Sequence, residues 1–140
     1  MDIRSILKQV DIYYEENHGK KAETLMQESI LQAMQEQDDE SLLQLLNELL
    51  GYYRETSQYE NAFLIGEQAV SHAVKMGLDG TFPYATTLLN VANAYRAGGR
   101  LQESLEFYLQ VQAMYERLLT PDNIFIAGLE NNMSLLYQEM

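Results

Sequence analysis

The stretch Thr86–Leu119, TTLLNVANAYRAGGRLQESLEFYLQVQAMYERLL, reads as two amphipathic helices joined by a tight turn. In its first half, apolar side chains recur at the i, i+3, i+4, i+7 spacing that places them on one face of a helix. These positions are Leu88, Val91, Ala92 and Tyr95. Gly98 and Gly99 then predict a helix end, because glycine adopts the left-handed conformation at little steric cost. The second half carries its own stripe: Leu101, Ser104, Leu105, Tyr108, Val111, Tyr115 and Leu118.

One such hairpin cannot bury its apolar face alone, and the rest of the chain supplies further copies. The copies recur at a period of 42 residues, with a weaker N-terminal copy offset by 40 residues. Aromatic positions fall on aromatic positions and small residues on small ones. The matches include Tyr13, Tyr53, Tyr95 and Tyr137; Ala22, Ala62 and Ser104; and Asn90 with Asn132. A fixed period with retained residue sizes is typical of stacked repeats.

The pattern therefore predicts an all-α protein, an α-solenoid of antiparallel helical hairpins with about seven helices in three and a half repeats. The expected units are residues 2–37, which form a degenerate N-terminal repeat, residues 39–77, residues 82–119, and residues 121–140. We expect Thr81 to cap one first helix, with Pro83 in its first turn. We expect Thr120 to cap the last helix, with Pro121 at the first helical position.

The last helix is the first half of a fourth hairpin whose second half is absent. Its residues Met133, Leu136 and Tyr137 would normally be covered by that missing partner. Three explanations are open: a piece of a longer array, an edge covered in a homodimer, or a helix that itself acts as the cap. We favour the first.

Composition excludes several classes of function. The net charge of −12 leaves no basic stripe for nucleic acid or for an anionic membrane surface. The chain has no cysteine, and neither of its two histidines has neighbours at metal-binding spacing. No catalytic, phosphate-binding or zinc motif occurs, so we expect a non-enzymatic protein without cofactor or metal. We expect it to lie in the cytoplasm, because it shows neither a signal peptide nor a membrane span.

Two segments carry a family resemblance: NELLGYYRETSQYENAFLIGEQAV (residues 47–70) and NVANAYRAGGRLQESLEFYLQVQ (residues 90–112). Their small residues, and a tyrosine near the end of each first helix, resemble tetratricopeptide repeats. The usual repeat is about 34 residues, whereas the longer period here is similar to that of the kinesin light chain type. A HEAT-like repeat fits the spacing of Ala92, Tyr95, Gly99 and Ser104 less well.

The resemblance implies a right-handed superhelix whose first helices line a concave groove that holds a peptide. Carried onto this chain, the groove candidates are Asn47, Arg54, Thr86, Leu89, Asn90, Asn93, Arg96, Asn131 and Asn132. A wider groove-facing set adds Arg4, Lys8, Asp11, Tyr14, Gln44, Glu48, Gly51, Glu55, Gly128, Leu135 and Gln138.

Two readings stand for the most distinctive candidates. Asn90 and Asn132 offer amide donors and an acceptor for a peptide backbone, or they bridge neighbouring repeats. Arg54 and Arg96 lie one repeat apart and could grip a carboxylate, or each forms an ordinary salt bridge. The dense basic set by which chaperone-binding relatives clamp a carboxylate is not reproduced here.

Three functions follow from these patterns. The first is a protein-interaction module that binds a peptide or partner segment of unknown identity in the groove. The second is self-association through Met133, Leu136 and Tyr137. The third is the sensor domain of a larger bacterial regulator.

Overall fold

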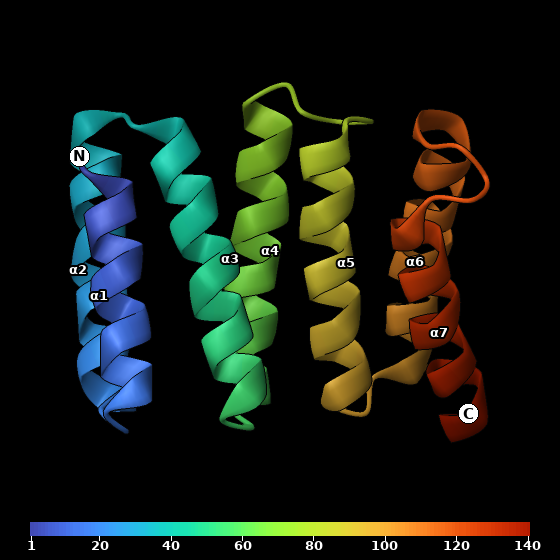
Figure 1. Ribbon diagram of the computed structural model, residues 1–140, viewed down its shortest axis with the longest axis horizontal. Helices are drawn as coiled ribbons and strands as arrows, with labels where there is room; N and C mark the ends of the chain where they lie inside the picture. The colour runs from blue at the N-terminus through green and yellow to red at the C-terminus, as the bar shows by residue number, and fades with distance from the viewer.

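The computed structural model describes all residues from Met1 to Met140 and contains seven helices and no strand (Figure 1). The helices are α1 (Ile3–Glu15), α2 (Gly19–Glu36), α3 (Asp39–Glu55), α4 (Tyr59–Lys75), α5 (Phe82–Ala97), α6 (Leu101–Leu118) and α7 (Ile124–Glu139). The all-α class predicted from the sequence is confirmed. None of these helices has the length and apolar character needed to cross a membrane.

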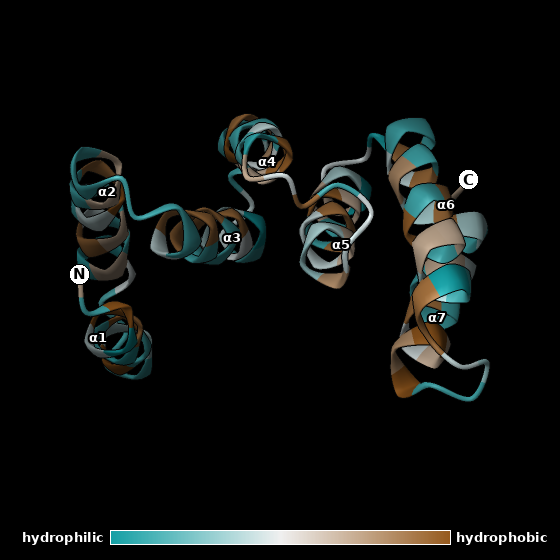
Figure 2. Ribbon diagram, turned by 90° about the horizontal axis from the view of Figure 1, so that it is seen from above, coloured by the Kyte–Doolittle hydropathy of each residue, from teal (hydrophilic) through white to brown (hydrophobic).

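The helices form a row in which each packs against its neighbours along the chain, and α3 also contacts α5. The two termini lie at opposite ends of the row (Figure 1). Seen from above, the odd-numbered helices occupy one side and the even-numbered helices the other (Figure 2). In the same view, α1 and α7 at the two ends of the row lie lower than α3 and α5 in the middle (Figure 2). The odd-numbered helices therefore curve around a concave face.

The turns inside the hairpins share one backbone feature. Asn17, Ser57 and Gly99 all adopt positive φ, at 59°, 59° and 81°. These positions follow α1, α3 and α5 respectively, and they reverse the chain into the next helix. The predicted stop after α5 is confirmed, and Asn17 and Ser57 adopt the same conformation although glycine is the residue best suited to it.

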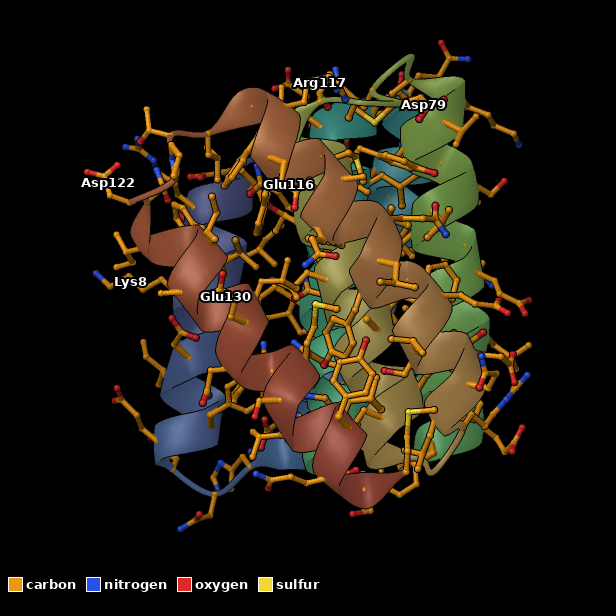
Figure 3. The ribbon with its side chains drawn as sticks, turned by 90° about the vertical axis from the view of Figure 1, so that its right-hand side faces the viewer. Lys8, Asp79, Glu116, Arg117, Asp122 and Glu130 are labelled. Carbon is orange, nitrogen blue, oxygen red and sulfur yellow. The ribbon has the colours of Figure 1, made fainter.

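Side-chain caps place the starts of several helices. Thr81 accepts a hydrogen bond from the backbone N–H of Tyr84, and Pro83 lies in the first turn of α5, as predicted. Asp38 caps α3 in the same way through the N–H of Ser41. The loop between α4 and α5 is held by Arg117, which reaches it from the end of α6 and donates to the Gly80 carbonyl at 2.9 Å (Figure 3).

Small residues at repeated positions let the two helices of each hairpin approach closely. Ala22, Ala62 and Ser104 are fully buried at matching places on α2, α4 and α6. Ser104 also donates its hydroxyl to the carbonyl of Ala92 at 2.8 Å, so its polar atom is satisfied within the core. A larger side chain at these positions would separate the helices and open voids in the packing.

An aromatic stack joins three successive helices. Tyr95 of α5 stacks on Phe63 of α4, with ring centroids 4.6 Å apart, and on Phe107 of α6 at 5.5 Å. The Arg100 guanidinium covers the Phe63 and Tyr95 rings at 4.8 Å and 4.9 Å. Gly98 makes room for this stack, because a Cβ there would lie 2.5 Å from the Phe63 ring.

Helix α7 differs from the prediction at its start. The Thr120–Pro121–Asp122 segment forms a turn, and the helix begins at Ile124. Asn123 is the N-cap, because its side-chain oxygen accepts the backbone N–H of Phe125 at 2.9 Å. Thr120 accepts only the N–H of Asn123 through its backbone carbonyl. The carboxamide of Asn123 thus supplies the cap that we had assigned to the Thr120 hydroxyl.

The prediction that Met133, Leu136 and Tyr137 form an uncovered edge of α7 is wrong for two of these three residues. Met133 is 6% exposed and Leu136 is fully buried, and only Tyr137, at 54%, faces solvent. Together with Leu129, Met133 and Leu136 form a stripe that packs into the core between α5 and α6. The helical period places these residues toward the preceding hairpin, so they do not await a missing partner.

We expect Asn123→Ala to lower the free energy of unfolding by about 1 kcal/mol, because it removes the side-chain cap of α7. Thr120→Ala is the matched control and should leave stability nearly unchanged. Urea unfolding followed by circular dichroism measures both. A larger loss for Thr120→Ala would restore the cap assignment made from the sequence.

Candidate functional site

Two adjoining cavities hollow the concave face. The first, of about 610 Å³, is lined by Tyr14, Asn17, Gly19, Asn47, Glu48, Gly51, Tyr52, Arg54, Glu55, Thr56 and Asn90. The second, of about 630 Å³, is lined by Arg54, Glu55, Ser57, Tyr59, Asn93, Arg96, Ala97, Asn132 and Glu139. They meet at Arg54 and Glu55. The helices that contribute most of these residues are α1, α3, α5 and α7, the concave set of Figure 2.

The structure brings six of the nine groove candidates to these cavities. Asn47, Arg54 and Asn90 line the first cavity, and Asn93, Arg96 and Asn132 join Arg54 around the second. The other three candidates lie outside both. Thr86 returns its hydroxyl to the Phe82 carbonyl, Leu89 packs against the core between α5 and α6, and Asn131 is exposed on α7.

Asn47 and Asn90 form a ladder between α3 and α5. The Asn90 side-chain amide donates to the Asn47 side-chain oxygen at 2.8 Å. The Asn47 amide in turn donates to the Leu43 carbonyl at 3.1 Å and to the Thr87 hydroxyl at 3.2 Å. These bonds connect neighbouring first helices, as the bridging interpretation of Asn90 expects, whereas the Asn132 side chain makes no such bond. The Asn90 side-chain oxygen has no partner within the protein and remains an available acceptor.

The two arginines already have acidic partners. Arg96 donates from Nε to the Tyr108 hydroxyl at 3.2 Å and from a terminal nitrogen to Glu139 at 3.3 Å. The Tyr108 hydroxyl in turn donates to the Asn93 side-chain oxygen, so α5, α6 and α7 share one polar network. Arg54 pairs with the adjacent Glu55 at 3.1 Å. The positive charge of this face is therefore largely balanced within the protein.

An aromatic wall closes one side of the first cavity; Tyr14 belongs to the wider groove-facing set expected from the sequence, whereas Tyr52 does not. Tyr14 of α1 and Tyr52 of α3 stack with their centroids 6.0 Å apart and their planes 9° from parallel. Gly19 lies against this wall, because a Cβ there would approach the Tyr52 ring to 3.3 Å. From the sequence, the Tyr52/Tyr53 pair is interpreted as core. The one sequence feature that could have indicated this wall is Gly19. The equivalent positions of the other repeats carry the larger residues Tyr59 and Leu101.

Glu48 is the one carboxylate of the first cavity without an ion-pair partner. Burial among the atoms of the cavity raises the pKa of its carboxyl, and the nearby Asp11 adds to the rise, although the side chain keeps access to solvent. Burial, with Glu48 as the next contribution, also raises the pKa of Tyr14 to about 12. The charged form of Glu48 is therefore disfavoured in the folded protein.

The geometry offers hydrogen-bonding groups and an aromatic surface, but no grouping of three or more His, Cys, Asp or Glu residues that could hold a metal ion. The hydrogen-bond donors and acceptors of the concave face line two open cavities, whose size suits side chains of another molecule.

The fold is that of a helical repeat protein of the tetratricopeptide-like type found in kinesin light chain structures, as the resemblance predicted. A protein from Podosopora anserina, described as a kinesin light chain with nearly identical TPR-like repeats, superposes with a TM-score of 0.87 and 21% identity over 99% of this chain and 69% of that chain. A variant of the same protein gives a TM-score of 0.87 and 21% identity over 98% and 66%.

BtubC, also called BKLC, from P. vanneervenii superposes with a TM-score of 0.87 and 22% identity over 97% of this chain and 54% of that chain. The chain thus spans between 54% and 69% of the lengths of these structures. No protein-family model matches the sequence, and no curated protein sequence matches it. At these identities the likeness establishes the fold.

We expect Glu48→Gln to raise the melting temperature at pH 7. The raised pKa means that the folded protein holds a proton at Glu48 more tightly than the unfolded chain, so the contribution of Glu48 to stability falls as pH rises through its folded pKa. The gain should vanish below about pH 4, where the carboxyl is protonated in both states. Glu40→Gln, on the same helix outside both cavities, should give no gain. Thermal unfolding between pH 3 and pH 8 measures this, and a destabilised Gln variant at pH 7 would contradict it.

Proposed function

We propose that the chain is a protein-interaction module that binds an extended segment of a partner protein along its concave face. The observation that supports this is the pair of adjoining cavities on α1, α3, α5 and α7, which share Arg54 and Glu55. A segment that follows this line would cross the odd-numbered helices and contact several repeats at once. The repeat fold supports binding rather than catalysis as the role.

Several polar groups remain free for such a segment. The Asn90 side-chain oxygen has no protein partner, and the Asn132 side chain makes no hydrogen bond within the protein. A carboxamide can donate and accept at once, which suits an extended peptide backbone. Asn47 and Arg96, by contrast, are engaged in bonds between helices. In this proposal they hold the walls of the groove in place, and the free groups contact the ligand.

Gly51 provides a direct test, because it lines the first cavity and a Cβ added there would meet no atom within 4 Å. We expect Gly51→Leu to reduce binding of peptides selected from a display library by more than about tenfold. The fold should gain stability, since leucine replaces glycine inside a helix at a benefit of roughly 0.5–1 kcal/mol. Isothermal titration calorimetry measures the binding.

The matched control is Gln110→Leu, at an exposed position on α6 that lines neither cavity. It should leave binding unchanged. If the selected peptides bind Gly51→Leu as tightly as the unsubstituted protein, or if Gln110→Leu is the variant that loses binding, the concave face is not the binding surface.

Self-association is a second candidate, which the outer face of α7 favours. Ile124 is 80% exposed, Phe125 is 51% exposed and Tyr137 is 54% exposed. A helix following α7 or a second copy of the chain would cover this face.

The predicted repeat boundaries, the right-handed superhelix, the cytoplasmic location and the sensor-domain role stay predictions.

If α7 mediates self-association, Ile124→Glu should shift a dimer to monomer in sedimentation velocity runs at several concentrations. The fold should be unaffected, because Ile124 is almost fully exposed. Leu31→Glu, at a 62% exposed position on α2, is the control and should leave the dimer intact. A monomer at all concentrations in the unsubstituted protein would exclude this candidate.

A further inference from the structure

The charges that line the first cavity do not balance. Arg54 is its one basic residue, and its guanidinium is paired with Glu55 at 3.1 Å. Glu48 has no ion pair, and neither has Asp11, which lies close enough to influence the pKa of Glu48. The free charge of the cavity is therefore negative. Carboxylates left without partners in a partly desolvated site favour a positively charged ligand.

The aromatic wall of the same cavity is an independent feature. The Tyr14 and Tyr52 rings stack nearly parallel beside Glu48. Tyr52 is 8% exposed, and its hydroxyl makes no hydrogen bond within the protein but keeps access to solvent. This hydroxyl lies next to Gly19, which also lines the cavity, with 3.4 Å between the oxygen and a Cβ at that glycine. A tyrosine hydroxyl that lines a cavity and has no partner within the protein is available to a hydrogen-bond donor of a ligand.

The shape of the cavity suits a long side chain with a charged end. Its volume is about 610 Å³, and Gly51 and Gly19 leave two of its walls without side chains. Arginine and lysine carry an apolar stem that packs on aromatic rings, and a cationic head that tyrosine faces also attract. The Asn90 side-chain oxygen, which has no partner in the protein and belongs to a residue lining the same cavity, is a further acceptor for such a head group.

We propose that the first cavity is a specificity pocket for an arginine or lysine side chain of the bound partner, with Glu48 pairing with the cation and the Tyr14–Tyr52 wall holding its stem. This proposal rests on the proposed function of the concave face and names the chemistry that this face selects. The Tyr52 hydroxyl and the Asn90 oxygen accept further N–H groups of the head group. The partner segment is basic.

The rival ligand chemistry, an acidic segment gripped by Arg54 and Arg96, finds fewer free groups. Arg96 is held by Tyr108 and Glu139, and Arg54 by Glu55. An acidic segment would have to displace these partners and lie beside Glu48. The net charge of −12 adds a long-range field that attracts a basic segment and repels an acidic one.

The test is an NMR titration of the full chain, labelled with ¹⁵N, with N-acetyl-arginine N-methylamide as the probe. N-acetyl-citrulline N-methylamide has nearly the same shape without the charge, and N-acetyl-glutamate N-methylamide has the opposite charge. We expect the arginine probe to shift the amide signals of Tyr14, Glu48 and Tyr52. The arginine probe should bind at least about tenfold more tightly than the citrulline probe, because citrulline is uncharged and cannot form a charged hydrogen bond with Glu48.

Glu48→Gln should remove this preference for arginine over citrulline. Glu40→Gln changes the net charge equally and lies on the same helix outside the cavity, so it should keep the preference within about twofold if the contact is local and only weakly screened. Equal binding of arginine and citrulline probes, equal effects of the two variants, or a preference for glutamate would overturn the proposal.

The peptide selection separates this proposal from the proposed function. Selected peptides that lose binding in Gly51→Leu, yet carry no enrichment of arginine or lysine, would overturn the specificity pocket and leave the interaction module standing. Peptides enriched in basic residues that depend on both Gly51 and Glu48 would support both. Absence of any peptide sensitive to Gly51→Leu would count against the interaction module itself.

Discussion

The stacking of Tyr95 between Phe63 and Phe107 is the contact on which the continuity of the solenoid depends. It joins the second helix of one hairpin to both helices of the next, so neighbouring hairpins share one aromatic core. Gly98 leaves the space that the Phe63 ring fills, and Arg100 closes the stack on the outside. Each repeat buries its apolar stripe only against its neighbours, which is why this junction matters more than any single hairpin.

Helix α7 differs from the earlier first helices in the exposure of its repeated tyrosine. Tyr137 is the repeat equivalent of Tyr53 and Tyr95, which are 5% and 4% exposed, but Tyr137 is 54% exposed on α7. The stripe of Leu129, Met133 and Leu136 nevertheless packs fully against α5 and α6. A terminal helix can thus complete the core on its inner side while leaving its outer side available.

On the concave face, the polar residues divide into those that hold helices together and those that remain free. The Asn47–Asn90 ladder and the network of Arg96, Tyr108 and Glu139 fix the spacing of the odd-numbered helices. Glu48 lacks an ion-pair partner and its side chain is exposed, although its surroundings raise the pKa of its carboxyl. A carboxylate that lines a cavity without a partner is a reasonable place to look for ligand recognition.

The sequence by itself determined the all-α class, the helix order and most turns, since these depend on local spacing, caps and glycine. The family resemblance, and not the periodicity, implied that the first helix of each repeat lines a concave face. Only the tertiary structure decided that Asn123 rather than Thr120 caps α7, that Met133 and Leu136 face inward, and that Tyr14 and Tyr52 form a wall. It also decided that Asn90 bonds to Asn47, 43 residues away along the chain. Such pairings depend on how helices distant in sequence pack together, so a local sequence pattern does not predict them.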